Sequence, residues 1–138
     1  MPSPEPLEEY IRVAEFRAAL RRFLRRSERV ARECGLTPQR YLLLLMIKGS
    51  ADSSESSTVT ELAERLQLAQ STVTELVGRA EGAGLVEREP SSADGRVAHL
   101  RLTARGEERL ARAFTSLESE RKHLLSALTS LDSDAQPT

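Results

Sequence analysis

The chain has 138 residues with a formal net charge of −1, of which 39% are hydrophobic and 30% are charged. These values suit one helix-rich domain with an apolar core and a charged surface, and they exclude a disordered or fibrous chain. No apolar run approaches the roughly 20 residues that span a bilayer, and the Pro-rich N-terminus and single Cys predict neither a signal peptide nor an internal disulfide, so we expect a cytoplasmic protein.

The N-terminal part predicts a short arm followed by one long helix. Residues 1–6 contain three Pro, which a helix interior does not tolerate, and we expect this arm to be flexible. Apolar residues then recur at helical spacing over residues 7–35, where Gly35 is expected to end the helix in the left-handed conformation. The helix carries eight Arg, and the favoured interpretation is a solvated face with Glu–Arg pairs.

The next helix is predicted to form the centre of the core. Thr37 and Pro38 are a start signal, because a hydroxyl cap precedes Pro at the first helical position. Residues 41–47 are almost wholly apolar, and a helix that is apolar all round is buried. Residues 50–57 are rich in Ser and Asp without periodicity, which predicts a mobile loop.

Two short helices joined by a tight turn are predicted next. Residues 58–66 and 70–81 both have an amphipathic pattern, and such a pair is a helix-turn-helix. The pattern then changes to strands at residues 85–88 and 96–102, separated by a polar turn. A hairpin in this place is the wing of a winged helix-turn-helix.

The C-terminal part predicts one further long helix. Thr103 is expected to cap it, and an apolar stripe continues over residues 104–131. Residues 132–138 are expected to form a disordered tail. The predicted fold class is therefore mainly α with a small β-hairpin wing, in which a winged helix-turn-helix over residues 36–103 is flanked by long helices.

The second helix of the pair has the composition of a DNA-recognition helix. Readout of the major groove needs short polar side chains at the start of such a helix, close to base edges. The candidates for these contacts are Gln70, Ser71, Thr72 and Thr74. The alternative interpretation is that Ser71 and Thr72 only cap the helix.

The wing adds candidate charged contacts. Arg96 is expected to project from the hairpin tip and enter the minor groove, with Asp94 holding its guanidinium in a bidentate pair. The alternative is a surface ion pair of little energetic value. Arg79 is a further candidate for DNA contact, while Arg88 and Arg101 are weaker candidates for contacts to phosphates.

Catalytic and metal sites are not predicted. His99 and His123 fall in different elements without spaced Cys or Asp partners, so a zinc site lacks its ligands. No Gly-rich phosphate loop and no pair of nucleophile and base is present. Cys34 lies at a helix C-terminus, whose dipole disfavours a thiolate, so inert packing is favoured. No cofactor is expected, and an enzyme is the remotest hypothesis.

Several short motifs in order resemble the MarR family of bacterial regulators. The resemblance covers residues 36–106 and is carried by residues 36–42, 60–66, 71–77, 84–88, 94–96 and 100–103. It implies a homodimer of triangular outline, in which helices 7–35 and 104–131 dimerise. It also implies that each winged domain reads one half of a pseudo-palindrome in duplex DNA, with the recognition-helix contacts above and Arg96 oriented by Asp94.

The family resemblance also implies a small effector. Family members often bind small aromatic or lipophilic ligands between the dimerisation and DNA-binding parts. The candidate lining residues in this chain are Phe16, Phe23 and Tyr41. An ordinary core position is the alternative for each of them.

Two features differ from the usual family pattern. The recognition helix, residues 69–81, contains one Arg against Glu75 and Glu81, which predicts weak phosphate attraction and a shallow salt dependence. Gly78 in the same helix costs about 1 kcal/mol relative to Ala. The family also usually ends with a further helix that interlocks the dimer, and with none expected after residue 131 we predict a smaller or rearranged dimer interface.

The leading hypothesis is therefore a homodimeric, ligand-responsive repressor that binds specific double-stranded DNA. The alternative is a winged-helix adaptor that binds other proteins and has weak or no specific DNA binding. Glu75 and Glu81 motivate this alternative. Specific DNA affinity that survives physiological salt would exclude the adaptor.

Overall fold

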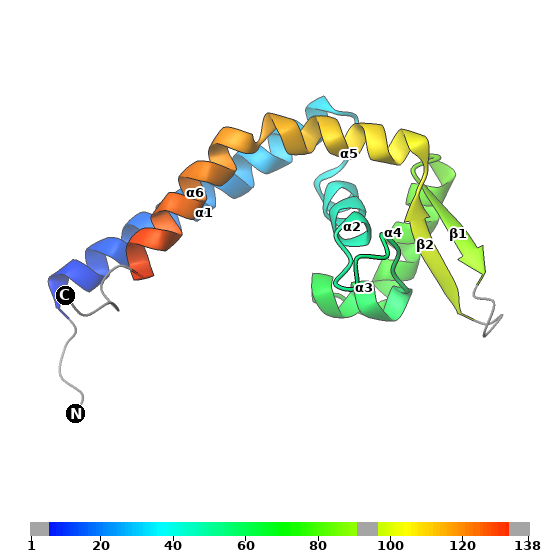
Figure 1. Cartoon of the computed structure of the whole chain (residues 1–138), viewed down its shortest axis with the longest axis horizontal. Helices are drawn as coiled ribbons and strands as arrows, with labels where there is room; N and C mark the ends of the chain where they lie inside the picture. The colour runs from blue at the N-terminus through cyan, green and yellow to red at the C-terminus, as the bar shows by residue number, and fades with distance from the viewer. Residues whose placement is uncertain (1–5, 91–96, 133–138) are drawn as a thin grey trace.

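The computed structural model describes residues 6–90 and 97–132, which form six helices and one antiparallel two-stranded sheet. The order is α1 (Leu7–Glu33), α2 (Pro38–Lys48), α3 (Val59–Leu66), α4 (Gln70–Gly82), β1 (Val86–Pro90), β2 (Ala98–Leu102), α5 (Ala104–Ser116) and α6 (Glu118–Asp132). Helices α2–α4 and the hairpin gather into one unit, which we call the winged unit (Figure 1). The predicted fold class is confirmed.

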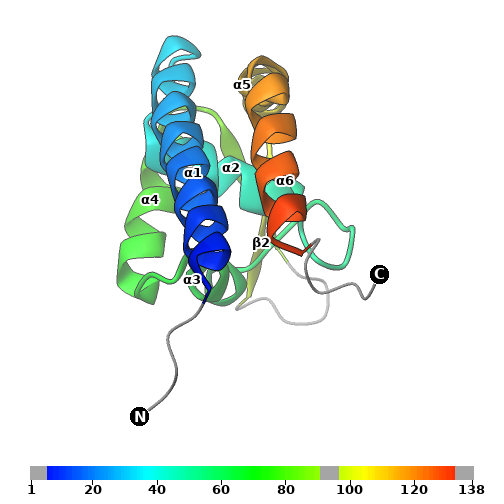
Figure 2. The ribbon, with the colours of Figure 1, turned by 90° about the vertical axis from the view of Figure 1, so that its left-hand side faces the viewer.

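Helices α1 and α6 form an arm that extends away from the winged unit. They run side by side in opposite directions, as Figures 1 and 2 show together. An ion pair between Arg26 Nε and Glu120 Oε1, at 3.3 Å, joins them. The predicted end of α1 is confirmed, because Gly35 follows with φ of 76°, a conformation that glycine adopts without strain. No helix of the described residues is long and apolar enough to cross a bilayer.

The prediction of one uninterrupted helix over residues 104–131 is wrong. Leu117 separates α5 from α6 with φ of −100° and ψ of 7°, and its N–H bonds to the carbonyl of Phe114, three residues earlier. The Leu117 side chain is fully buried, so the chain turns where this residue packs into the core. The C-terminal part thus holds two helices instead of one, and α6 packs along α1. The smaller or rearranged dimer interface stays a prediction.

Helix α2 is the centre of the core, but it is not buried all round as predicted. Leu43, Leu44 and Ile47 are fully buried, and the helix contacts α3, α4, α5 and β2. Leu42 points away from these neighbours and is 42% exposed. An apolar run alone therefore did not distinguish the core face of this helix from its outer face.

The segment before α3 is tied to the hairpin, a contact that its sequence did not predict. Ser57 pairs with Leu100 of β2 through two backbone hydrogen bonds of 3.1 and 2.8 Å. This bridge gives the hairpin a short third partner and buries Ser57 to 2% exposure. The pairing fixes the start of the helix-turn-helix against the wing.

Helix α3 begins with a capping box at Thr58. The Thr58 hydroxyl accepts from the N–H of Glu61 at 3.2 Å, while the Thr58 N–H donates to the Glu61 carboxylate at 2.9 Å. We expect Thr58→Ala to lower the free energy of unfolding by about 1 kcal/mol, because it removes the first of these bonds. Thr58→Ser keeps the hydroxyl and is expected to retain most of that stability in urea denaturation. Equal losses in the two variants would contradict a role for the cap.

Candidate nucleic-acid interface

Helices α3 and α4 have the geometry of a helix-turn-helix. Gln67 caps the end of α3, its φ of 57° and ψ of 47° place it in the left-handed region, and α4 begins three residues later. One face of α4 packs on the core through Val73, Leu76, Val77 and Ala80. The opposite face is therefore presented to solvent, as recognition of a DNA groove requires.

The exposed start of α4 carries the four predicted base-contact residues. Ser71, Thr72 and Thr74 are exposed, and their hydroxyls have no hydrogen-bond partner among residues 6–90 and 97–132. The N-cap of α4 is Ala69, which makes no side-chain cap bond, so the interpretation that Ser71 and Thr72 only cap the helix is wrong. Gln70 is also exposed, and its Nε2 donates to the hydroxyl of Thr60 at 3.4 Å.

The two arginines predicted to contact DNA from α4 and β1 each have a glutamate beside them. Arg79 Nη2 lies 3.1 Å from Glu75 Oε1, one helical turn earlier. Arg88 Nε donates to both carboxylate oxygens of Glu81, at 3.0 and 3.1 Å. The second pair joins the last turn of α4 to β1. Sequence reasoning named Glu75 and Glu81 as acidic substitutions but did not predict these partners.

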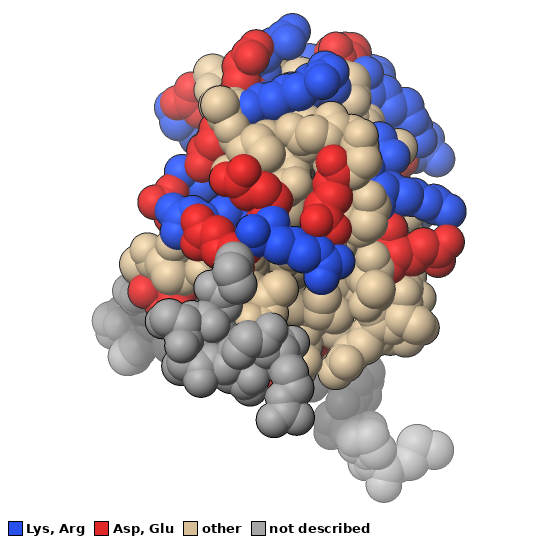
Figure 3. Space-filling view, turned by 90° about the vertical axis from the view of Figure 1, so that its right-hand side faces the viewer, with Lys and Arg blue, Asp and Glu red and all other residues tan. Residues whose placement is uncertain are grey.

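The remaining described arginines of the helix-turn-helix and hairpin are also engaged. Arg65 of α3 donates to two backbone carbonyls at the C-terminal end of α2, at 3.1 Å each. Arg101 of β2 lies 3.4 Å from Glu89 Oε1 and donates to the carbonyl of Ser54 at 3.3 Å. Where the hairpin side of the molecule is not covered by undescribed residues, basic and acidic side chains lie interspersed (Figure 3).

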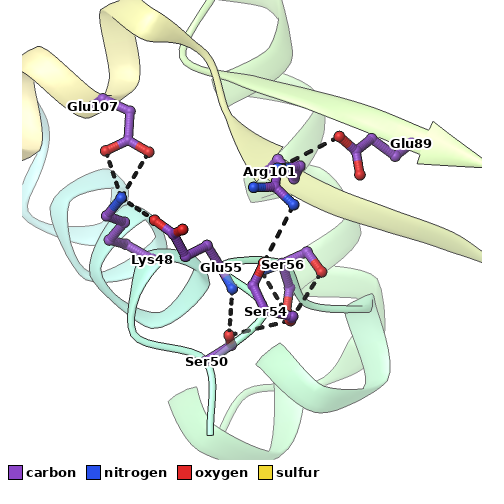
Figure 4. Close-up of polar contacts among 8 residues, drawn as sticks. All are labelled: Lys48, Ser50, Ser54, Glu55, Ser56, Glu89, Arg101 and Glu107. Atoms are coloured by element: carbon purple, nitrogen blue, oxygen red, sulfur yellow. Dashed lines mark hydrogen bonds and ion pairs between the residues drawn. The ribbon is translucent and has the colours of Figure 1, made fainter. Parts of the chain in front are cut away.

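A polar network connects α2 and α5 to the loop that contacts the wing. Lys48 at the end of α2 pairs with Glu55 and, at 3.0 Å, with Glu107 of α5 (Figure 4). The hydrogen bond from Lys48 holds the pKa of Glu55 below its ordinary value, and the bonds to the two carboxylates raise the pKa of Lys48. Because Ser54 lies in the same loop and accepts from Arg101, the network links the loop to β2.

The hairpin itself is confirmed, with boundaries slightly shifted from the prediction. The strands pair from Val86 opposite Leu102 to Pro90 opposite Ala98. Asp94 and Arg96, the predicted minor-groove pair, lie outside the described residues. Their roles therefore remain predictions from the sequence.

The three predicted effector-binding residues have different surroundings. Phe23 lines a groove of about 550 Å³ between α1 and α6, together with Arg22 and His123. Phe16 lies two turns earlier on α1 and is half-buried. Tyr41 belongs to the core on α2 with 5% exposure, and burial raises the pKa of its hydroxyl. Tyr41 does not line the groove beside Phe23.

The residues considered for metal binding or redox chemistry are dispersed. His99 is on β2 and His123 is on α6. Within residues 6–90 and 97–132, no three His, Cys, Asp or Glu side chains come together as a metal site. Cys34 is buried at the end of α1, as inert packing requires.

Comparisons with known proteins identify relatives among bacterial transcriptional regulators. A model of the MarR family matches residues 35–97. The HTH-type transcriptional repressor IacR of Pseudomonas putida is 32% identical over 91 residues, which make up 66% of this chain and 52% of that protein. The chain thus spans about half the length of this curated relative.

Solved structures share the fold over nearly the whole chain. The transcriptional regulator Tm0710 from Thermotoga maritima aligns with a TM-score of 0.63 and 26% identity, covering 94% of this chain and 82% of that one. A Cys-to-Ser mutant of MarR from E. coli, solved in complex with operator DNA, aligns with a TM-score of 0.67 and 19% identity. That alignment covers 96% of this chain and 100% of the other, so the similarity in fold extends beyond the winged unit.

Proposed function

The chain belongs to the MarR family, and on this premise we propose that it is a transcriptional repressor that binds a pseudo-palindromic operator as a homodimer. The start of α4 would enter the major groove, and the hairpin would lie along the neighbouring minor groove. Each copy would read one half of the operator. A small aromatic or lipophilic effector would release the DNA.

The observation that carries this proposal is the set of free hydroxyls at the start of α4. Ser71, Thr72 and Thr74 are exposed, lack described protein partners and do not serve as caps. Hydroxyls on the first turns of a recognition helix can donate to or accept from base edges in the major groove. They stand opposite the face that anchors α4 to the core, so they are held in place by a packed element.

The proposed homodimer rests on apolar side chains that the arm leaves uncovered. These side chains belong to α1 and α6 and are 48–70% exposed: Leu7, Tyr10, Ile11, Val13, Leu24, Leu125 and Leu128. Soluble monomers rarely leave so many large apolar groups together on one extension, and a second copy of the arm would cover them. Sedimentation is expected to show a dimer, and a monomer at micromolar concentration would contradict this part of the proposal.

DNA binding through α4 is tested with alanine variants of its first turn. We expect Ser71→Ala and Thr72→Ala each to weaken binding to the operator by about 1–3 kcal/mol, the usual cost of losing a base contact. Fluorescence anisotropy with duplexes from the gene's own upstream region measures the affinity. Binding of random duplexes is expected to change little, because that binding depends on phosphate contacts.

The matched control is Thr115→Ala on α5. Thr115 is also exposed on a helix, but it belongs to the long C-terminal part rather than to the winged unit. We expect this variant to bind the operator like the wild type. The proposal fails if no upstream duplex binds above random DNA, or if all three alanine variants bind the operator alike.

The groove beside Phe23 is the proposed place for the effector. Its lining combines an aromatic ring with basic side chains, which suits an aromatic molecule with an acidic group. A panel of aromatic acids is expected to contain members that raise the melting temperature of the wild type but not of Phe23→Ala. Equal shifts in both proteins would place the effector elsewhere.

The pairing of arginines favours one other function, that of a protein-binding adaptor. Arg79, Arg88 and Arg101 all have glutamate neighbours, so these three described arginines offer little free positive charge to DNA. An adaptor would show no specific duplex affinity at physiological salt. The anisotropy titration of the wild type therefore distinguishes the two functions directly.

A further inference from the structure

The helix-turn-helix and the hairpin carry an unusual balance of charges for a part of the chain that is proposed to bind DNA. Residues 58–102 contain five Arg and no Lys, against six Glu and one Asp. Four of these arginines lie in the described residues, and each contacts an acceptor of the protein itself. A DNA-binding surface ordinarily keeps its basic groups free for phosphates.

Three of the four arginines are held by glutamates that lie on or beside the predicted DNA surface. Glu75 and Arg79 are 68% and 64% exposed on α4, one turn apart. Glu81 and Arg88 join α4 to β1. Glu89 and Arg101 lie on neighbouring strands of the wing.

These ion pairs are too exposed for stability to be their main effect. Exposed pairs contribute little to the free energy of folding, because water and salt screen them. Their carboxylates nevertheless act on an approaching phosphate. Each one offsets the charge of an arginine and adds repulsion within the Debye length of about 10 Å at 0.1 M salt.

We propose that Glu75, Glu81 and Glu89 restrain the attraction of this surface for the DNA backbone, so that binding depends on base contacts from α4. The inference rests on the proposed function. Backbone attraction is independent of sequence and raises affinity for every duplex alike. Lowering it leaves the hydroxyl contacts of α4 intact, so affinity falls by a similar factor for the operator and for random DNA, and only a duplex that also makes base contacts still binds at physiological salt.

The test replaces the three glutamates by glutamine, singly and together. Glu→Gln keeps the size of the side chain and removes its charge. The control for each single variant is Glu28→Gln, which makes the same change in net charge on an exposed site of α1, outside the winged unit. Affinity for a random-sequence duplex is measured by anisotropy between about 50 and 200 mM salt, where backbone contacts dominate.

We expect each glutamine to release one arginine for a phosphate contact. The slope of log affinity against log salt would then steepen by roughly 0.9 for each substitution, and each substitution would increase the ratio of affinities at the two salt concentrations about three- to fourfold. Random DNA would bind more tightly to the triple variant than to the wild type. The operator would gain by a similar factor, so the triple variant would occupy random DNA at protein and salt concentrations where the wild type occupies only the operator.

The outcomes separate this inference from the proposed function. If the wild type binds an operator and each single variant has the affinity and salt slope of Glu28→Gln, the restraint is refuted and the regulator stands. If the wild type prefers no duplex but the triple variant gains affinity for random DNA with a steeper slope, the restraint stands and the operator function fails. If neither protein binds DNA at low salt, both are refuted.

Discussion

Replacing Gly106 by alanine is expected to lower the free energy of unfolding by about 3 kcal/mol, the upper part of the range for overpacking a core. Gly106 is buried in the first turn of α5. An added methyl group there would overlap the carbonyl oxygen of Leu85 and lie 3.1 Å from its carbonyl carbon. Because the obstacle is backbone, no side-chain rotation relieves the overlap.

Hydrogen bonds around Thr103 prevent the first turn of α5 from moving away. The Thr103 N–H donates to the carbonyl of Leu85 at 3.0 Å, and its hydroxyl donates to the carbonyl of Gly84 at 2.6 Å. The same hydroxyl accepts from the N–H of Gly106 at 3.1 Å. Separating the two segments to admit a methyl group would stretch these bonds together, at the junction between the winged unit and α5.

Urea denaturation of Gly106→Ala and Gly78→Ala tests this account of the junction. Gly78 lies mid-helix in α4, where an added methyl group meets nothing within 4 Å. Gly78→Ala is therefore expected to stabilise the protein by about 1 kcal/mol through helix propensity. A loss of less than about 1 kcal/mol for Gly106→Ala would mean that α5 does not approach Leu85 as described.

The second large effect is expected at the centre of α2. Leu44 is fully buried, and Leu44→Ala is expected to cost about 2–5 kcal/mol because it leaves a cavity among packed neighbours. Leu42→Ala on the same helix is the control, since that side chain is 42% exposed and its loss should cost within about 1 kcal/mol. Chemical denaturation measures both, and similar losses would contradict the orientation of α2.

Local signals in the sequence predicted most of the fold. Thr37 and Thr58 each cap the helix that follows, and Gly35 adopts the positive φ expected after α1. The amphipathic pattern predicted the buried face of α4, as Val73 and Val77 confirm. Caps, left-handed glycines and helical periodicity depend on residues a few positions apart, so they can be recognised in a single sequence.

Three features that escaped prediction depend on how separate elements pack against one another. No Gly or Pro marks the break at Leu117, which arises because that side chain packs into the core. The pairing of Ser57 with Leu100 joins residues 43 positions apart in the chain. The contact of Glu81 with Arg88 requires the turn between α4 and β1 to bring both side chains together.

The central claim, that paired copies of this chain read DNA by sequence through α4, is tested most directly by selection from a random duplex library. The selection would use the wild-type protein at physiological salt. The account predicts enrichment of a pseudo-palindrome whose half-sites lie about 10 to 10.5 base pairs apart, or a multiple of that spacing, centre to centre. A selected pool with no common motif, or with single unpaired half-sites, would contradict it.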